Sequence, residues 1–265
     1  STAEGQTPQL FVRWMGTGDT ARLTGLPTAP SDIAWSPDGT RIAYSMLVPA
    51  EPVALDRSAK RPDGADWAKP LEIYERVTYR TDAEGYLKPG VEHIFLISAD
   101  GGAPRQLSFG KLPVQGSIDW TTDGRAIVFS ANRTERWQLD PNDTELFELA
   151  VDSGAIRPLT DRRGPDANPA VSPDGRWIAY TGYDDTGRTY EVDELWVIPR
   201  AGGTPRRLTA TLDRSVAQPI WSADSRAVYV RNDDRGRMRV TRVGLDGSTR
   251  VVAEGLNGSQ LDRPY

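Results

Sequence analysis

The stretch IAWSPDGTRIAYS, residues 33–45, contains the pattern from which the fold can be predicted. An apolar segment ending in tryptophan leads into Ser36-Pro37-Asp38-Gly39, and a second apolar segment follows. Proline presets φ at the second position of a type I turn, and glycine is favoured at the fourth position. Because residues typical of strands lie on both sides of this turn, the stretch predicts a β-hairpin.

The same pattern recurs in residues 118–130, 169–181 and 219–231. The turn residues of the four copies, Asp38, Asp123, Asp174 and Asp224 (Ser-Pro-Asp-Gly or a variant of it), lie 85, 51 and 50 residues apart. Between the copies lies a second kind of hairpin that closes with Leu-Thr or Leu-Ser. Its leucines, Leu23, Leu107, Leu159 and Leu208, lie 84, 52 and 49 residues apart. Two independent sets of anchors give the same periods, so the chain consists of repeats.

Each repeat predicts four short strands, A to D, and repeated units of this kind are typical of a β-propeller. The predicted fold class is all-β, a propeller of four-stranded antiparallel blades within a single domain, 1–265. The predicted parts are a half blade at 9–24, a blade at 33–108 with an insertion at 47–90, and blades at 118–160, 169–209 and 219–253. We expect a piece of a larger ring rather than a small closed one, and its unpaired edge strands predict self-association.

The amino-acid composition argues against several classes of function. The 265 residues include no cysteine and one histidine, and the net charge is -5. The lack of cysteine excludes a thiolate metal site, a single histidine argues against a multi-histidine centre, and we expect neither cofactor nor metal. A negative net charge argues against nucleic-acid binding. No apolar run reaches the roughly 20 residues that span a bilayer, so no membrane partner is expected.

The insertion is the most distinctive part of the sequence. It contains Trp67-Ala68-Lys69-Pro70, Tyr79-Arg80 and Glu84-Gly85-Tyr86-Leu87, and His93-Ile94-Phe95 follows it. With residues 129–149 and 164–169, these segments resemble the N-terminal propeller of the prolyl-oligopeptidase family of serine peptidases, in its acylaminoacyl-peptidase-like bacterial branch. The generic Ser-Pro-Asp-Gly turns fit many other propellers.

This resemblance implies a non-catalytic propeller that covers the active site of a peptidase and restricts access to short peptides. The implied partners are an α/β-hydrolase domain of the same protein and short peptide substrates. Similar bacterial enzymes are often exported, which favours a periplasmic parent over a cytoplasmic one. A hydrolase nucleophile would need a Gly-x-Ser-x-Gly string, which does not occur, so no catalytic residue is expected here. The alternative is a self-standing propeller, similar to the Tol-system protein, that binds a protein or peptide.

The candidate site lies in the insertion. Because it joins strand B at 42–46 to strand C at 93–98, it must project from the end of the blade that also carries the D–A linkers. Loops held by a rigid scaffold often carry function. We therefore expect Tyr79, Arg80, Glu84 and Tyr86 to face the hydrolase domain or the substrate, with Arg80 pairing with a carboxylate. The alternative is a loop that caps the blade with Trp67 and Tyr74.

Other polar groups favour structural roles. His93 begins a strand, and a general base would need a nucleophile within hydrogen-bonding reach. The acid pairs Asp184-Asp185 and Asp233-Asp234 follow B strands and are expected to be solvated, with a hard cation as the alternative. Glu191, Asp193 and Glu194 approach another strand and would be suited to hold a substrate amine, although a structural role is favoured.

Overall fold

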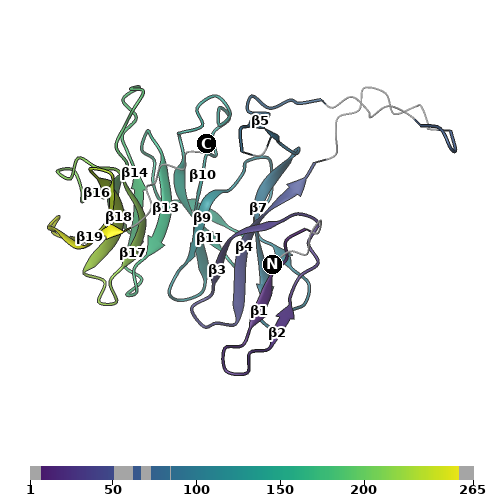
Figure 1. Ribbon diagram of the computed structural model, residues 1–265, viewed down its shortest axis with the longest axis horizontal. Coiled ribbons are helices and arrows are strands. Elements are labelled where there is room, and N and C mark those ends of the chain that lie inside the picture. The colour runs from purple at the N-terminus through teal and green to yellow at the C-terminus, as the bar shows by residue number, and fades with distance from the viewer. Residues whose placement is uncertain (1–6, 51–61, 67–72, 84, 257–265) are drawn as a thin grey trace.

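The computed structural model describes residues 7–50, 62–66, 73–83 and 85–256. Four four-stranded antiparallel sheets stand side by side, and a two-stranded sheet lies beside the first of them (Figure 1). This arrangement confirms the predicted all-β fold of four-stranded blades. Within the described ranges, no helix is long and apolar enough to cross a membrane.

The strands follow one another in the order A, B, C, D within each sheet, with A and D at its two edges. Blade 1 contains β3 (Pro30–Trp35), β4 (Arg41–Pro49), β7 (Gly90–Ser98) and β8 (Arg105–Gln106). Blade 2 contains β9 (Gln115–Trp120), β10 (Ala126–Ala131), β11 (Glu145–Ala150) and β12 (Ile156–Pro158). Blade 3 contains β13 (Asp166–Val171), β14 (Trp177–Gly182), β15 (Glu194–Pro199) and β16 (Arg206–Arg207). Blade 4 contains β17 (Val216–Trp221), β18 (Ala227–Asp234), β19 (Arg237–Gly244) and β20 (Thr249–Leu256).

Two further strand pairs lie outside the four blades. Strands β1 (Phe11–Arg13) and β2 (Thr20–Arg22) form the two-stranded sheet beside blade 1. Strands β5 (Arg80–Thr81) and β6 (Gly85–Tyr86) form a small sheet inside the insertion. In blade 1, β4 and β7 pair over nine residues each, from Arg41 opposite Ser98 to Pro49 opposite Gly90, so both strands continue past the expected ranges 42–46 and 93–98.

A carboxylate closes each A–B turn. In blade 1, the Gly39 N–H donates to the Ser36 carbonyl over 2.9 Å, and Gly39 has φ +69°. The Asp38 carboxylate accepts from the Ser36 hydroxyl over 2.6 Å and from the Thr40 N–H over 3.0 Å, which lowers the pKa of Asp38 to about 2. The hydroxyl-to-aspartate bond recurs in the other three blades as Thr121–Asp123, Ser172–Asp174 and Ser222–Asp224. The aspartate therefore recurs in every repeat because its carboxylate accepts the hydrogen bonds that close the turn.

The Leu-Thr or Leu-Ser ending also has a physical role. The Thr160 hydroxyl accepts a 2.9 Å hydrogen bond from the Leu146 N–H at the start of β11, while Leu159 is buried. The same bond links Leu10 to Thr24, Ile94 to Ser108 and Leu195 to Thr209. Each closing leucine enters the core or its edge, and the following hydroxyl satisfies a main-chain donor that the sheet leaves unpaired.

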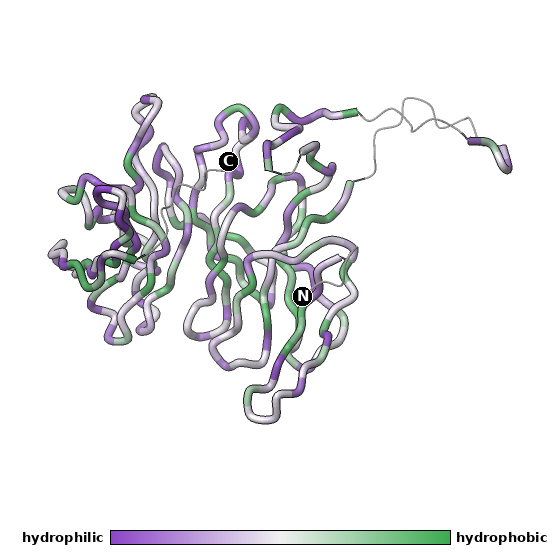
Figure 2. The backbone as a smooth tube through the Cα atoms, in the orientation of Figure 1, coloured by the Kyte–Doolittle hydropathy of each residue, from purple (hydrophilic) through white to green (hydrophobic). Residues whose placement is uncertain are grey.

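The core lies between neighbouring blades, where the tube in Figure 2 is green along the central strands. Buried residues of blades 1 and 2 form one cluster around Ile94, Trp120 and Phe129. A second cluster joins blades 2 and 3 through Leu146 and Tyr180, and a third joins blades 3 and 4. Because adjacent blades share their apolar side chains, each one is stabilised by its neighbours.

The two ends of each blade carry different connections between strands. The turn face carries the A–B and C–D turns, and the loop face carries the B–C loops and D–A linkers, including residues 62–66, 73–83, 85–89, 132–144, 161–165, 183–193 and 210–215. Contacts show that B–C loops and D–A linkers meet at the loop face. Arg162 of one linker bonds to Asp184 of a B–C loop over 2.8 Å, and Arg214 of another linker bonds over 3.0 Å to Asp234, the last residue of β18 before the B–C turn of blade 4.

Candidate functional site

The described part of the insertion forms a short hairpin on the loop face. Strands β5 and β6 pair Arg80 with Tyr86 and Thr81 with Gly85, and the Leu87 N–H donates to the Tyr79 carbonyl over 2.9 Å. This pairing brings Tyr79, Arg80 and Tyr86, three of the four predicted site residues, onto one hairpin. Glu84, the fourth predicted site residue, lies outside the described residues, as does Trp67.

Tyr74 joins these residues and completes a tyrosine cluster, which consists of Tyr74, Tyr79 and Tyr86. The ring centroids lie 5.2 Å apart for Tyr74–Tyr86, 5.9 Å for Tyr74–Tyr79 and 6.2 Å for Tyr79–Tyr86. Tyr86 is 61% exposed and Tyr79 48% exposed, so two rings present their surface to solvent. Tyr74 was named only in the alternative interpretation, as a residue that caps the blade, although its aromatic type and short distance from Tyr79 in the sequence were available signals.

Arg80 supplies a cation beside this aromatic surface. Its guanidinium lies 5.9 Å from the centroid of the Tyr86 ring, and the residue is exposed. A guanidinium above a ring gains from the negative π face while its donors stay available for a carboxylate. The cluster with Arg80 therefore combines apolar contact area, hydroxyl groups and one positive charge.

Contacts with blade 2 fix the hairpin in place. The Arg76 guanidinium donates to the Gly90 carbonyl and lies 5.6 Å from the centroid of Trp137 in the B–C loop of blade 2. The Val77 N–H donates to Gln138 Oε1 of the same loop over 3.0 Å. The tyrosine cluster is thus held between the insertion of blade 1 and the loop face of blade 2.

A buried ionic network lies on the loop face between blades 2 and 3. Arg162 pairs with the carboxylate of Asp166, which has no exposed area, and with Asp184. Its guanidinium also lies 4.3 Å from the centroid of Trp196. The Thr160 hydroxyl donates to Glu145, so that acid joins the same network. One arginine thus holds a D–A linker, a B–C loop and the first residue of β13 together.

Two departures from the repeat make room for this network. Where blade 3 has Asp166, blades 2 and 4 have Val114 and Val216, both buried. Where blade 1 has Met46, blade 3 has Gly182, and a Cβ there would overlap the Pro165 carbonyl and lie 2.8 Å from the Arg162 guanidinium. Departures from an otherwise consistent repeat are places to look for function.

Burial dominates the electrostatics of the network. Loss of solvation and the charge of Asp166 raise the pKa of Glu145 to about 8, although the Thr160 hydroxyl acts in the opposite direction. Burial also raises the pKa of Asp166, and the Arg162 charge offsets part of this. Burial similarly raises the pKa of the Tyr180 phenol beside them. Burial therefore disfavours the charged form of both carboxyls, and the network resembles a structural support more than an open binding site.

The single histidine forms a contact that superficially resembles a catalytic pair. His93 Nδ1 lies 3.2 Å from the Ser108 hydroxyl, but both side chains are buried. Ser108 accepts the Ile94 N–H as its equivalents do in other blades, and burial lowers the pKa of His93. This pair therefore belongs to the repeat architecture, in agreement with the structural role favoured for His93.

The other acidic residues considered as binding groups each have a different polar partner. Asp184 pairs with Arg162, and Asp234 pairs with Arg214 and Arg239. Glu191 accepts from the Thr186 hydroxyl, and Glu194 pairs with Arg207 over 3.2 Å. Within the described ranges, no three acidic or histidine side chains form a group suited to a metal ion.

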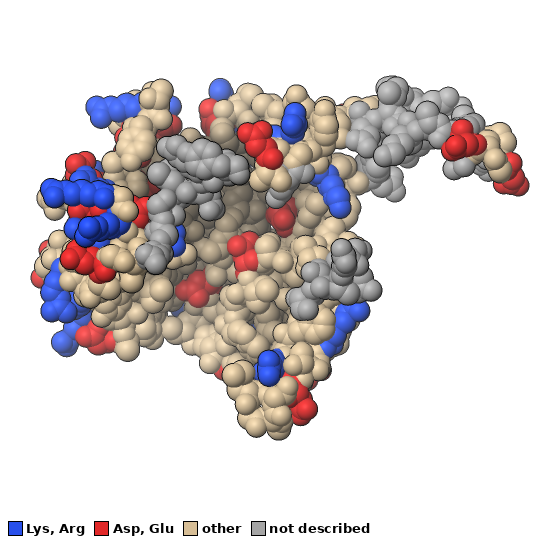
Figure 3. Space-filling model, in the orientation of Figure 1, with Lys and Arg blue, Asp and Glu red and all other residues tan. Residues whose placement is uncertain are grey.

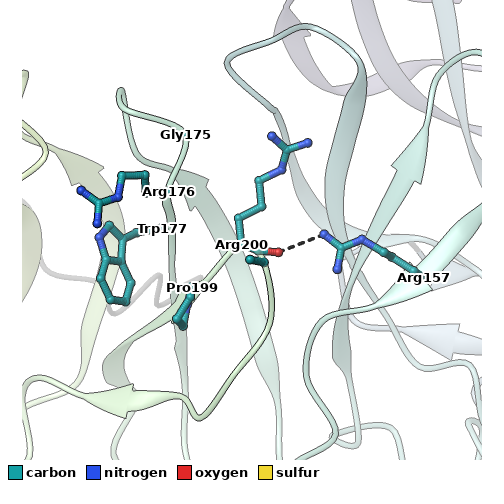
Figure 4. Close-up of a pocket in the computed structure, with 7 residues that line it drawn as sticks. Arg157, Gly175, Arg176, Trp177, Pro199 and Arg200 are labelled. Atoms are coloured by element: carbon teal, nitrogen blue, oxygen red, sulfur yellow. Dashed lines mark hydrogen bonds between the residues drawn. The ribbon is translucent and has the colours of Figure 1, made fainter.

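The turn face carries an open pocket of about 540 Å³ between blades 2 and 3 (Figure 4). Its lining includes Arg157, Arg176, Trp177 and Arg200. Figure 4 shows the Arg157 guanidinium donating to the Arg200 carbonyl, a 3.0 Å bond. Equivalent arginines bridge the other blade interfaces: Arg105 donates to the Val151 carbonyl over 2.7 Å and Arg206 to the Leu245 carbonyl over 3.1 Å. The pocket is therefore lined by side chains that join blades.

Comparison with known proteins agrees with this architecture. The model of the dipeptidyl peptidase IV (DPP IV) N-terminal region matches residues 66–185. The uncharacterized peptidase YuxL of Bacillus subtilis is 27% identical over 98% of this chain. Dipeptidyl-peptidase 5 of Trichophyton equinum is 28% identical over 49% of it. These matches confirm the predicted resemblance to the N-terminal propeller of prolyl-oligopeptidase-family peptidases.

Solved structures show the same fold. Acylaminoacyl peptidase of Pyrococcus horikoshii superposes with a TM-score of 0.69 at 19% identity over 93% of this chain and 35% of its own. TolB of Acinetobacter baumannii superposes with a TM-score of 0.60 at 15% identity over 94% of this chain and 49% of its own. The chain spans 41% of YuxL and 20% of the Trichophyton peptidase. It is a propeller domain similar to those of peptidases.

Proposed function

We propose that this chain is the access-controlling propeller of a prolyl-oligopeptidase-family serine peptidase that acts on short peptides. The loop face would meet the α/β-hydrolase domain of the same protein, and the tyrosine cluster with Arg80 would line the approach to the active site. The propeller contributes no catalytic group. Its role is to admit short peptides and to hold them before they reach the nucleophile.

The observation that carries this proposal is the exposed tyrosine cluster beside Arg80. Tyrosine rings offer large contact areas to apolar side chains, and their hydroxyls bond to peptide groups. The Arg80 guanidinium suits the terminal carboxylate of a short peptide, since it presents two parallel donors. Anchoring through Arg76 and Gln138 keeps this surface preorganised, which reduces the entropy lost on binding.

The test compares Arg80→Ala with Arg188→Ala in the full-length peptidase. Both changes remove an exposed arginine from the loop face, but Arg188 lies in the B–C loop of blade 3, away from the cluster. We expect Arg80→Ala to lower kcat/KM for short peptides by about tenfold, equivalent to about 1.4 kcal/mol, and to spare a small uncharged ester. Arg188→Ala should leave both substrates unchanged.

Each result has a defined meaning. Equal peptide kinetics for the two variants at unchanged Tm would remove Arg80 from the substrate path. Equal losses for peptide and ester would show an effect on the hydrolase domain rather than on peptide recognition. A full-length protein that lacks peptidase activity and does not react with a serine-directed fluorophosphonate would favour the self-standing, partner-binding propeller.

A further inference from the structure

The pocket on the turn face lies where blade 3 departs from the repeat. In every blade the residue after strand C donates its N–H to the carbonyl of the residue before strand B, and these pairs are Ala99–Thr40, Val151–Arg125, Arg200–Arg176 and Leu245–Arg226. This shared bond identifies equivalent positions at the turn-face end of the four blades. The residues that line the pocket therefore have known counterparts in the other blades.

Three lining residues differ in kind from these counterparts. Arg200 stands where the other blades have an apolar residue, Ala201 where they have an aspartate, and Trp177 where they have an alanine or an arginine. The counterparts in blades 1, 2 and 4 are, in that order, Ala99, Val151 and Leu245; Asp100, Asp152 and Asp246; and Arg41, Ala126 and Ala227. Blade 3 thus loses an acid and gains a cation and an aromatic ring in one small area.

The contact between blades 2 and 3 beside the pocket also departs from the repeat. At the other two interfaces a residue of strand C and the residue after strand C of the next blade belong to one apolar cluster, Leu96 with Val151 and Val197 with Leu245. Here the same two positions hold Glu148 and Arg200, which pair over 3.0 Å. An apolar pair in such a place is often at least as stable as a buried ion pair. Packing alone therefore does not explain the charges, and departures of this kind point to function.

Two arginines present donors to the pocket. Arg176 is exposed, and its guanidinium forms neither an ion pair nor a hydrogen bond with a residue that the structure describes. Asp174 of the same turn is engaged by the Ser172 hydroxyl and by the Arg176 main-chain N–H. The Arg157 side chain is 46% exposed and donates through Nη2 to Glu148 and to the Arg200 carbonyl, which leaves Nε and Nη1 for another acceptor.

Trp177 and Pro199 supply an apolar surface between these donors. They pair across β14 and β15, and both are partly buried. Arg206 lies 5.0 Å from the centroid of the Trp177 ring and holds it from the D strand of the same blade. Figure 4 shows Arg176 and Trp177 on one side of the pocket and Arg157 on the other. The pocket therefore combines an aromatic ring with guanidinium groups on two sides.

The size and surroundings of the pocket favour a small anion. Its volume of about 540 Å³ falls within the range of small-molecule sites, roughly 300–1,000 Å³. Figure 3 shows Lys and Arg side chains concentrated at the end of the molecule formed by blades 3 and 4. Because the chain as a whole carries a net charge of -5, this end differs in sign from the average of the molecule. A local excess of positive charge attracts anions to nearby pockets.

We propose that this pocket binds a small aromatic anion, a planar ring system that carries a carboxylate or a phosphate. The ring packs on Trp177 and Pro199, and the anionic group accepts hydrogen bonds from Arg176 and Arg157. Arg200, held by Glu148 and Asp123, positions the Arg157 guanidinium through its own carbonyl. The site lies on the turn face, at the opposite end of the blades from the tyrosine cluster, and is separate from the proposed substrate path.

The experiment titrates chain 1–265 with two aromatic anions and their neutral counterparts by isothermal titration calorimetry. The pairs are N-acetyltryptophan with N-acetyltryptophanamide, and adenosine 5′-monophosphate with adenosine. We expect at least one anion to bind with a Kd below about 1 mM and about tenfold more tightly than its neutral counterpart. Comparison of the two anions shows whether the carboxylate or the phosphate is preferred. Added salt should weaken the binding, because the donors lie near the surface.

Substitutions assign the binding to this pocket. Arg176→Ala should weaken binding of the anion about tenfold and leave the neutral compound unchanged. Arg226→Ala is the matched control, since Arg226 is the equivalent exposed arginine of blade 4, and it should leave both unchanged. Trp177→Ala, which introduces the residue found in blades 2 and 4, should weaken both compounds. Ala201→Asp restores the turn acid of the other blades and should weaken the anion by repulsion, without removing a lining group.

The results that would overturn the proposal are equally defined. They are an absence of binding by both anions up to about 10 mM, equal affinity for the charged and neutral compounds, or an equal loss in Arg176→Ala and Arg226→Ala. Tm measurements establish that each variant is folded. If Trp177→Ala does not fold, Arg176→Ala and Ala201→Asp still decide the result, because both changes are at exposed positions. None of these readouts uses peptidase activity, so the outcome is independent of the proposed gating role.

Discussion

Trp120 donates its indole N–H to the Ala34 carbonyl over 3.1 Å, and this bond crosses from blade 2 to blade 1. Trp120 is 4% exposed, while Trp35 at the equivalent position of blade 1 is 50% exposed. The same residue type at the same repeat position is thus a buried interface group in one blade and a surface group in another. The reason is that blade 1 has no complete blade before it within the described residues, only β1 and β2.

This difference predicts unequal costs for one substitution. Trp120→Phe should lower the free energy of unfolding by about 2 kcal/mol, because a buried carbonyl loses its donor and a cavity opens. Trp35→Phe should change it by about 0.5 kcal/mol or less. Urea denaturation of both variants measures the difference, and equal costs would contradict the assignment of Trp120 as an interface residue.

The Arg162 network predicts a strong non-additive effect. Arg162→Ala should lower the free energy of unfolding by about 3–5 kcal/mol, because the buried Asp166 carboxylate loses its partner. The double variant Arg162→Met with Asp166→Val should recover most of this loss, since valine is the residue at the same position in blades 2 and 4. Chemical denaturation of the single and double variants provides the test; additive losses would show that the two side chains do not act as a pair.

Glu145 predicts a dependence of stability on pH. Its pKa is raised from 4.5 to about 8 in the folded protein by burial and by Asp166. The folded state therefore holds a proton that the unfolded chain releases, and its contribution to stability is full below about pH 4.5 and is lost as pH rises towards about 8. The turn aspartates, whose pKa values are lowered, titrate below this range.

The measurement compares Tm for wild-type protein and Glu145→Gln at pH 5, 6, 7 and 8. Glutamine cannot ionise, so the variant should lose less stability than the wild type as the pH rises. The Tm of the variant minus the Tm of the wild type should therefore increase from pH 5 to pH 8. Parallel Tm curves would show that Glu145 is ionised in the folded protein throughout.

Chain 1–265 should not react with a serine-directed fluorophosphonate. The prediction follows from the buried His93–Ser108 contact, in which Ser108 accepts a main-chain N–H as part of the repeat. Mass spectrometry of the treated protein should show no adduct, with a known serine peptidase as the positive control. Stoichiometric labelling of one serine would require a nucleophile that the repeat does not explain.

The repeat itself was predictable because its signals are local. Asp38 and Ser36 lie two residues apart, and their hydrogen bond closes the turn whatever the rest of the chain does. Thr160 lies next to Leu159, and the pair serves one strand end. Turn chemistry and alternating apolar residues operate over a few residues, so one sequence was enough to predict an all-β fold built from four-stranded blades.

The residues of the candidate site could be predicted only in part. Tyr79, Arg80 and Tyr86 were expected to act together because they share one short insertion. Tyr74 appeared only in the alternative of a capping loop, since nothing in the sequence shows that its ring lies 5.2 Å from that of Tyr86. The anchoring of Val77 on Gln138 joins residues 61 positions apart, and such contacts depend on how blades 1 and 2 dock.

The repeat period, the turn chemistry and the end of the blade from which the insertion projects follow from the order of the residues. Which polar residues become buried partners depends on how the blades pack against one another. Asp166 and Gly182 look unremarkable in the chain, yet the packing of blades 2 and 3 buries one carboxylate and opens space for the Arg162 guanidinium. Likewise, Glu148 of β11 and Arg242 of β19 occupy the same position of strand C in blades 2 and 4 but carry opposite charges. The hydrogen bonds of a turn form between neighbours in the chain, so the sequence is enough to predict them. Burial and ion pairing between blades depend on surfaces that exist only once the blades are docked.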